Sequence, residues 1–270
     1  MQVEAHAKIN WALRVTGRRD DGFHDLETLF QEISLHDTLT IEPAERFSFT
    51  CDDRTIPTDE RNLVVRAARA LHTPPVAIHL QKRIPAGGGL GGGSSDAAAT
   101  LVALAKMFSI DAPLAEIALQ LGSDVPFFLL GGTAYATGRG EVLTPMPSPG
   151  EIPLLLLFPG HRVLTAQAFR MLRAFSPALG IARYSSMLAS DFLSHDSELA
   201  NDFESPVFDA YPNLGALVSR LRDAGATLAR MSGSGSTIFG AFRDVATRDA
   251  AMNSFGDVRH AAAVSLPPRL

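Results

Sequence analysis

The residues with the clearest chemical potential are the glycines of one short stretch: six of the seven residues from Gly87 to Gly93 are glycine. An alternating strand pattern ends before them at Pro85, and a helical pattern follows from about Ser95 or Asp96, which are common N-cap residues. Glycine lets the backbone approach a ligand closely, and the N-terminus of a helix attracts an anion. The pattern predicts a phosphate-binding loop, with a flexible linker as the alternative.

The neighbouring residues exclude two common kinds of phosphate loop. No lysine follows the glycines as a P-loop requires, and the chain contains neither the HRD nor the DFG motif of protein kinases. The strand pattern before the loop alternates, which disfavours the fully buried strand of a dinucleotide-binding sheet. The residues therefore indicate a nucleotide or phosphate site of another class.

Two charged residues have the chemistry to act on an acceptor of a phosphoryl group. Lys8 alternates with apolar residues near the start of the chain, and Asp124 follows a Gly-Ser pair and precedes an apolar run. A carboxylate can take the proton of a hydroxyl, and a lysine can offset negative charge and keep the base ionised. The ordinary alternatives are a solvated strand lysine and an aspartate that caps a helix or a turn.

Composition and charge exclude several other classes of protein. The 270 residues include 24 Lys and Arg and 29 Asp and Glu, a net charge of -5, so no positive field favours nucleic acid or a membrane. Cys51 is the only cysteine, which excludes an intramolecular disulfide and argues against a cysteine zinc site. The histidines show no HExxH or His-x-His spacing. With no membrane-length apolar run and no signal-peptide pattern, we expect a cytoplasmic protein.

The patterns along the chain predict an α+β protein of two domains. Three prolines between Thr144 and Gly150 favour a linker there, so the predicted domains are 1–150, which holds the glycine loop, and 151–270. The predicted strands are 3–15, 36–42, 47–51, 76–81, 154–158 and 237–242, and the predicted helices are 62–72, 97–108, 165–175 and 214–224.

Several motifs taken together resemble the GHMP small-molecule kinases. Three occur in the family's order: Ala7-Lys8-Ile9-Asn10, PAGGGLGGGSSDAAA from Pro85, and MSGSGSTIF from Met231. The stretches 16–24, 122–132, 136–141 and 201–204 further resemble the branch of the family that phosphorylates a cytidyl sugar alcohol. The resemblance covers about residues 5 to 242.

This resemblance implies a two-domain α+β kinase with its active site in the cleft between the domains. The N-terminal domain would be a nucleotide-binding domain like domain 2 of ribosomal protein S5, and the C-terminal domain would be ferredoxin-like. The implied reaction uses ATP and Mg²⁺ to phosphorylate a hydroxyl of a small cytidyl sugar alcohol. We expect no nucleic-acid or membrane partner, and the sequence is compatible with a monomer or a weak homodimer.

The resemblance also assigns roles to individual residues. Asp124 takes the position of the catalytic base and Lys8 that of its partner. The substrate-binding positions are Asn10, Phe23, His24, Thr165 and Phe169, with His24 reading the cytosine and Phe169 forming one side of an aromatic clamp. The ATP-binding positions include Asn62 and Lys82, which would lie near the nucleoside. The others form the loop around the phosphates: Pro85, Ala86, Gly87, Gly88, Gly89, Leu90, Gly91, Gly92, Gly93, Ser94 and Ser95. The Mg²⁺ ligands stay open, with Ser95 or Asp96 as candidates.

One residue departs from the family pattern, and two other functions stay open. Phe23 stands where the family usually has tyrosine, which keeps a ring face for stacking but removes a hydroxyl. The first alternative is another GHMP kinase of the homoserine or mevalonate type. The second is a non-catalytic binding protein of this fold, which the presence of both Lys8 and Asp124 disfavours.

Overall fold

The computed structural model describes residues 1–268, and these fall into two compact units. The chain passes between the units several times, and the predicted domain limits at 150 and 151 stay a prediction. Unit 1 comprises Met1–Ala7, Leu35–Ala86 and Gly91–Leu130, and unit 2 comprises Lys8–Ser34, Gly87–Leu90 and the chain from Gly131 onward.

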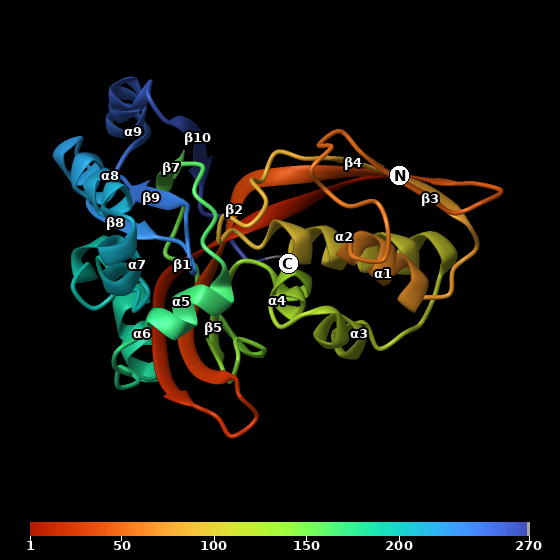
Figure 1. The fold of residues 1–270 in the computed structure, drawn as a ribbon, viewed down its shortest axis with the longest axis horizontal. Coiled ribbons are helices and arrows are strands. Elements are labelled where there is room, and N and C mark those ends of the chain that lie inside the picture. Colours follow the sequence, from red (N-terminus) through yellow and green to blue (C-terminus); the bar gives the residue numbers. More distant parts are fainter. Residues whose placement is uncertain (269–270) are drawn as a thin grey trace. The chain divides into compact units, whose positions relative to one another are not determined.

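Two long paired strands, β1 (Gln2–Arg18) and β2 (His24–Pro43), each contribute to both units (Figure 1). The sequence predicted most of β1 but only residues 36–42 of β2. The first half of β2 was missed because Thr28, Gln31 and Glu32 are as deeply buried as their apolar neighbours, which removes the alternation that marks a half-buried strand.

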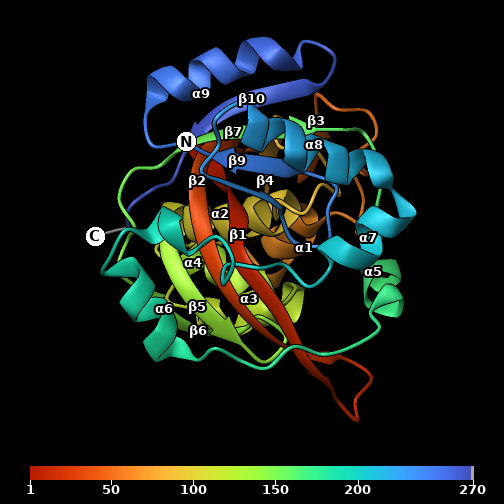
Figure 2. The ribbon, with the colours of Figure 1, turned by 90° about the vertical axis from the view of Figure 1, so that its left-hand side faces the viewer.

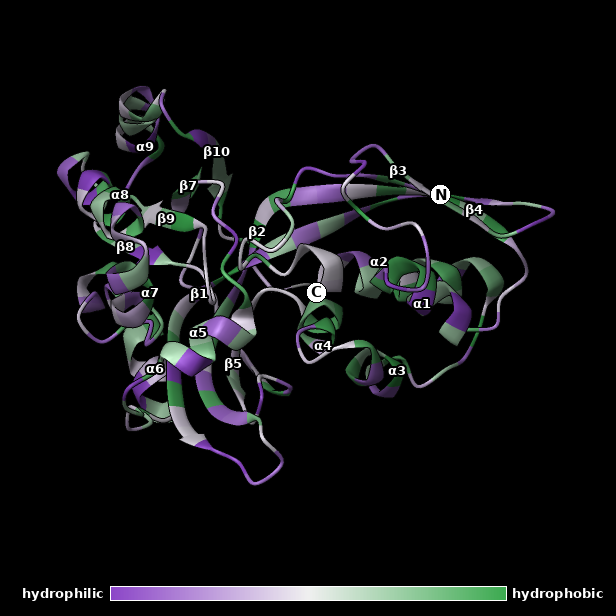
Figure 3. Cartoon of the chain, viewed as in Figure 1, coloured by the Kyte–Doolittle hydropathy of each residue, from purple (hydrophilic) through white to green (hydrophobic). Residues whose placement is uncertain are grey.

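Unit 1 packs helices against one face of its strands. β4 (Val76–Gln81) pairs antiparallel with β2 and parallel with β3 (Ser48–Cys51). Its alternate residues Val76, Ile78 and Leu80 are buried, as the sequence predicted. In Figure 1 the helices lie on one side of these strands, and Figure 3 shows α4 as apolar along its length. The helices are α1 (Leu63–Ala70), α2 (Gly92–Phe108), α3 (Leu114–Leu121) and α4 (Val125–Leu130).

The start of α2 corrects the sequence prediction. Gly91 is the N-cap with φ +71°, and the N–H of Ser95 donates to the Gly91 carbonyl at 2.9 Å. Ser95 and Asp96, the expected caps, therefore lie inside the helix and are 2% exposed. Glycine is a poor helix former, but a Cβ at Gly92 would lie 2.9 Å from Ile84, so close packing requires glycine in this first turn.

Unit 2 contains an antiparallel sheet in the order β10-β7-β9-β8. Leu155 and Leu157 of β7 share a core with Leu217 and Leu221 of α8 and Ala251 of α9. Figure 2 shows α8 and α9 beside these strands. The elements are β7 (Pro153–Phe158), β8 (Leu228–Met231), β9 (Ile238–Ala241), β10 (Arg259–Val264), α8 (Pro212–Asp223) and α9 (Val245–Met252).

A hairpin of unit 2 includes Pro145, the first of the three prolines of the predicted linker. β5 (Thr133–Thr137) pairs with β2 and with β6 (Val142–Met146), and Pro145 of β6 stands opposite Ala134. From the sequence, the prolines of 144–150 were not expected to join the hydrogen-bond ladder of a sheet. β6 is the last strand of its sheet, however, where a missing N–H costs no hydrogen bond with a neighbour.

The other helices of unit 2 are short. α5 ends at Met171, four residues before the predicted end of that helix. Two sheets with interspersed helices confirm the predicted α+β class. No helix within residues 1–268 is both long and apolar enough to cross a membrane. These short elements are α5 (Thr165–Met171), α6 (Ile181–Leu188), α7 (Glu204–Ala210) and the 3₁₀ turns η1 (Phe192–His195) and η2 (Asn253–Phe255).

Candidate active site

In unit 2 the glycine loop is held by direct contact with a second backbone segment. Gly89 has φ +79°, and a Cβ at this position would lie 2.1 Å from the carbonyl oxygen of Ser232. The Ser232 hydroxyl donates to the Gly89 carbonyl at 2.9 Å, and the N–H of Thr237 donates to the Gly88 carbonyl at 3.2 Å. Only glycine fits at position 89. The glycine loop and the second Gly/Ser cluster, 231–236, therefore hold each other in place.

The motif at 201–204 fixes the 231–236 cluster in turn. The Asn201 amide donates to the carbonyls of Met231 and Gly233, both at 2.8 Å. The Glu204 carboxylate accepts the N–H of Met231 at 2.7 Å, and burial raises the pKa of Glu204. Asn201 is 5% exposed, so its hydrogen bonds are shielded from water. The 201–204 motif therefore holds the 231–236 cluster, and that cluster in turn contacts the glycine loop.

Lys8, the predicted partner of the base, also contacts the part of the loop in unit 2. Its backbone N–H donates to the Leu90 carbonyl at 3.0 Å, and its ammonium donates to the Asn10 side chain at 2.8 Å. Asn10 in turn donates to the Thr28 hydroxyl at 2.8 Å. Asn10 is 1% exposed. Its hydrogen bonds to Lys8 and Thr28 orient the Lys8 ammonium in this structure. Sequence reasoning missed Thr28, because a single threonine in a strand carries no signal.

In unit 1 the rest of the glycine loop forms the first turn of α2. The first N–H groups of an α-helix have no partner within the helix, and here they belong to Gly92, Gly93 and Ser94. The aligned peptide dipoles of this 17-residue helix add partial positive charge at the same end. Because Gly92 and Gly93 have no side chain beyond a hydrogen atom, a ligand can approach their N–H groups closely. The turn therefore has the chemistry of an anion site.

A buried ion-pair cluster fixes the start of α2. The Lys82 ammonium contacts the Asp37 carboxylate and lies 3.0 Å from Asp96 Oδ2. Asp37 also accepts the N–H of Ile84 at 2.8 Å, which ties the end of β4 to the cluster. Burial raises the pKa of Asp96, and although burial opposes the charge of Lys82, Asp96 and Asp37 raise its pKa. Lys82, predicted near the nucleoside, has a side chain that is only 7% exposed.

Two further predicted residues have local structural roles in unit 1. Asn62 caps α1 by accepting the N–H of Val64 at 2.9 Å, and it donates to the Pro57 carbonyl at 2.8 Å. Asp124 directly precedes α4, in a turn where the N–H of Val125 donates to Gly122 at 3.1 Å. That position agrees with the capping alternative. The nucleoside contact of Asn62 and the catalytic role of Asp124 stay predictions.

His24 and Phe169, the two residues predicted to contact the cytosine, form an aromatic cluster with Phe203 in unit 2. The rings of His24 and Phe169 stack with centroids 4.5 Å apart at 14°, and Phe169 packs edge-on against Phe203. Burial, with a smaller effect from Arg18, lowers the pKa of His24, so its imidazole is neutral at pH 7. Two rings that hold a base between them lie near 7 Å apart, twice the usual contact distance. The His24 and Phe169 rings are too close for this, so they stack on each other with no room for a base between them.

Phe23 is 52% exposed and presents one ring face to the Arg139 guanidinium, 4.7 Å from its centroid. Arg139 belongs to the 136–141 motif, and the N–H of Leu26 donates to the Gly138 carbonyl at 2.7 Å. The stretches 16–24 and 136–141, which are far apart in the sequence, therefore lie together. A cation over an aromatic ring is a favourable contact.

Thr165 connects the aromatic cluster to the glycine loop within unit 2. It begins α5, and its hydroxyl lies 3.0 Å from the Ser234 hydroxyl. The Ser236 hydroxyl donates to the carbonyl of His161, just before the same helix. α5 carries Phe169, so the cluster at 231–236 contacts both the loop and the helix of the predicted cytosine clamp.

Comparison with known proteins gives a consistent family. The model of the GHMP kinases N terminal domain matches residues 62–132, and that of the GHMP kinases C terminal domain matches residues 180–258. A 4-diphosphocytidyl-2-C-methyl-D-erythritol kinase from Solibacter usitatus is 47% identical over 258 residues, covering 90% of this chain and 81% of that protein.

Solved structures agree with this result. A crystal structure of 4-(cytidine 5'-diphospho)-2C-methyl-D-erythritol kinase matches with a TM-score of 0.85 and 38% identity, covering 98% of this chain and 99% of the other. A homoserine kinase from Cytophaga hutchinsonii matches with a TM-score of 0.70 and 20% identity, covering 97% and 95%. At that identity the second match shows the common fold alone.

Proposed function

The chain belongs to the 4-diphosphocytidyl-2-C-methyl-D-erythritol kinases within the GHMP kinases, and we propose that it transfers the γ-phosphate of ATP to the 2-hydroxyl of 4-(cytidine 5'-diphospho)-2-C-methyl-D-erythritol. This reaction belongs to the non-mevalonate pathway of isoprenoid precursors. The observation that carries the proposal is the glycine loop, because contacts that only glycine permits fix its backbone at Gly89.

In the proposed reaction the acceptor oxygen attacks the γ-phosphorus as the bond to the β-phosphate oxygen breaks. Asp124 takes the proton of the hydroxyl, and ADP leaves. The Lys8 ammonium stabilises the negative charge that develops on the transferred group. Asn10 and Thr28 hold Lys8 in one orientation, so little reorganisation is needed during transfer.

The phosphates of ATP are proposed to bind along Gly87–Ser95, with the first turn of α2 as the main donor of N–H groups. Mg²⁺ prefers oxygen ligands. Ser95 offers a hydroxyl, and Asp96 Oδ1 is buried without a hydrogen-bond partner among the described residues, so these donors fit a hard cation. Mg²⁺ bound with ATP would neutralise phosphate charge, and Ser95 and Asp96 are the residues proposed to hold it.

The proposed substrate side is the aromatic cluster of unit 2. A neutral His24 has one ring N–H donor and one acceptor, which suits the edge of a cytosine. Thr165 and Phe169 on α5, together with Phe23, complete this side. Phe169 has to turn away from His24 before its ring can stack on a base whose edge faces the imidazole.

A comparison of acceptors tests the function. Purified protein with ATP and Mg²⁺ should phosphorylate the cytidyl substrate with a kcat/KM at least about a thousandfold above that for homoserine or mevalonate, because only the cytidyl substrate occupies the base site. Turnover followed by ADP release and ³¹P NMR gives the ratio. Preferential use of homoserine or mevalonate would assign the chain to another GHMP kinase, and no turnover of any acceptor would favour a binding protein.

Asp124→Asn should lower kcat at least about a hundredfold, since an amide cannot accept the proton. ATP affinity, measured by calorimetry, should stay within about twofold of wild type. Asp111→Asn, a change of an exposed aspartate also in unit 1, should leave both quantities unchanged. A near wild-type kcat in Asp124→Asn would remove this residue from the mechanism. Lys8→Met tests the partner by the same two measurements.

Phe169→Ala should raise the KM for the cytidyl substrate about tenfold with little change in kcat, because loss of one stacking face costs roughly 1–3 kcal/mol. It should also raise the pKa of His24 in an NMR titration, since removing the ring increases solvation of the imidazole. Phe175→Ala, at the more distant and exposed ring, should do neither. A lower KM in Phe169→Ala would show that Phe169 competes with the base.

A further inference from the structure

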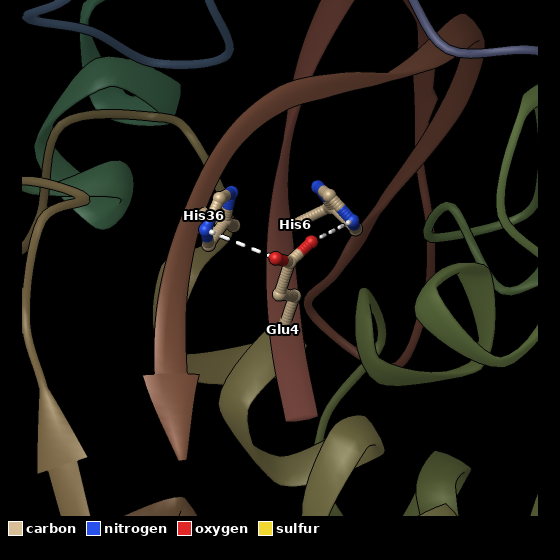
Figure 4. Close-up of side chains that lie close together, drawn as sticks. All are labelled: Glu4, His6 and His36. Carbon is tan, nitrogen blue, oxygen red and sulfur yellow. Dashed lines mark ion pairs between the residues drawn. The ribbon is translucent and has the colours of Figure 1, made fainter. Parts of the chain in front are cut away.

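Unit 1 carries a cluster of metal-type donors that the proposed kinase reaction does not use. The carboxylate of Glu4 lies between the imidazoles of His6 and His36, at 3.4 Å and 3.6 Å from their Nε2 atoms (Figure 4). One donor atom of each residue lies within 4.8 Å of the other two. The His6 and His36 rings meet edge to face with centroids 5.2 Å apart.

The strand register brings these residues together. Met1 and Ile41 exchange both backbone hydrogen bonds, at 2.7 and 2.8 Å. Continued without a bulge, this antiparallel pairing sets His6 of β1 opposite His36 of β2, because each lies five residues from that pair. Glu4 is two residues from His6 and so points to the same face. The histidines showed no sequence motif because the site is formed across two strands.

The cluster lies on the less buried face of its strands. Ala5 and Ala7 of β1, which flank His6, are buried, as are Asp37 and Leu39 of β2. The side chains of Glu4, His6 and His36 are 57%, 21% and 23% exposed. A cation can therefore reach the donors from solvent without opening the core of unit 1.

The geometry fits a transition metal better than mutual hydrogen bonding. The two Glu4 contacts are longer than the usual range of about 2.7–3.2 Å for an N–H···O hydrogen bond. Donors about 2.0–2.1 Å from a tetrahedral Zn²⁺ lie roughly 3.4 Å from one another. Each imidazole Nε2 already lies near this distance from one Glu4 oxygen, His6 from Oε2 and His36 from Oε1, and one donor atom of each residue lies within 4.8 Å of the other two, so side-chain rotations would bring the set around one ion.

We propose that Glu4, His6 and His36 form a binding site for one divalent transition cation of the Zn²⁺ class. Two imidazoles and one carboxylate favour Zn²⁺ over Mg²⁺ or Ca²⁺, which prefer oxygen ligands alone. Three protein donors leave at least one position for water. The ion joins the start of β1 to β2, so its binding stabilises unit 1. This site is independent of the kinase assignment.

Calorimetric titration of untagged, chelator-treated full-length protein with Zn²⁺ tests the proposal. We expect one ion per chain, binding at least about tenfold weaker in His36→Ala and in Glu4→Gln, and no displacement by millimolar Mg²⁺. His79→Ala is the matched control, because His79 lies on β4 opposite Thr40 and contacts Thr50 instead. Cys51→Ser controls for thiol binding, and both controls should keep the site.

Thermal unfolding supplies a second readout. Zn²⁺ should raise the unfolding temperature of the wild type and of His79→Ala, and not that of His36→Ala, since a ligand that binds only the folded state stabilises it. The circular dichroism spectrum of metal-free His36→Ala should match that of the wild type, which checks that the variant is folded. If Glu4→Gln, with a charge lost at an exposed position, and His36→Ala both bind Zn²⁺ as the wild type does, or if the wild type has no saturable site, the proposal is wrong.

Discussion

The close approach of the Ser232 carbonyl to the backbone of Gly89 is the constraint on which the candidate phosphate site depends. Two backbone segments approach so closely that a single methyl group would not fit between them. The glycine loop therefore has to be glycine at this point, and the Ser232 turn has to be held rigid. Asn201 and Glu204 provide that rigidity. The same turn contacts Thr165, so it also supports the helix that carries Phe169.

In unit 1 the start of α2 is held by a buried cluster of charged side chains. Desolvating Lys82 and two carboxylates is unfavourable, and their mutual attraction offsets that cost only when the geometry is good. Here the ammonium contacts both acids, while Asp37 also accepts a backbone N–H at Ile84. The main effect of this ion-pair cluster is to position the start of α2, and its effect on stability is smaller. It joins the end of β4 to α2, the helix whose first turn supplies the proposed anion-binding N–H groups.

The motifs, through their resemblance to a family, predicted the function of this chain, whereas local patterns placed several limits of its elements wrongly. The glycine loop and the 231–236 cluster were visible in the sequence because their compositions are unusual, whereas the role of Lys8 was assigned through the resemblance to the family. The start of α2 was placed too late, since packing against Ile84 overrides the low helix propensity of glycine. The strand at 24–35 was missed because Thr28 and Gln31 are buried polar residues. Contacts such as Asn10 to Thr28 depend on strand pairing, which no local pattern encodes.

The steady-state kinetics of Gly89→Ala test most directly the claim that this backbone contact positions the phosphate loop. The added methyl group would meet the Ser232 carbonyl, so kcat/KM for ATP should fall at least about a hundredfold in a protein that is folded by circular dichroism. Gly256→Ala, where a Cβ meets nothing within 4 Å and φ is -62°, should behave as wild type. A folded Gly89→Ala protein with unchanged kcat/KM for ATP would contradict the account.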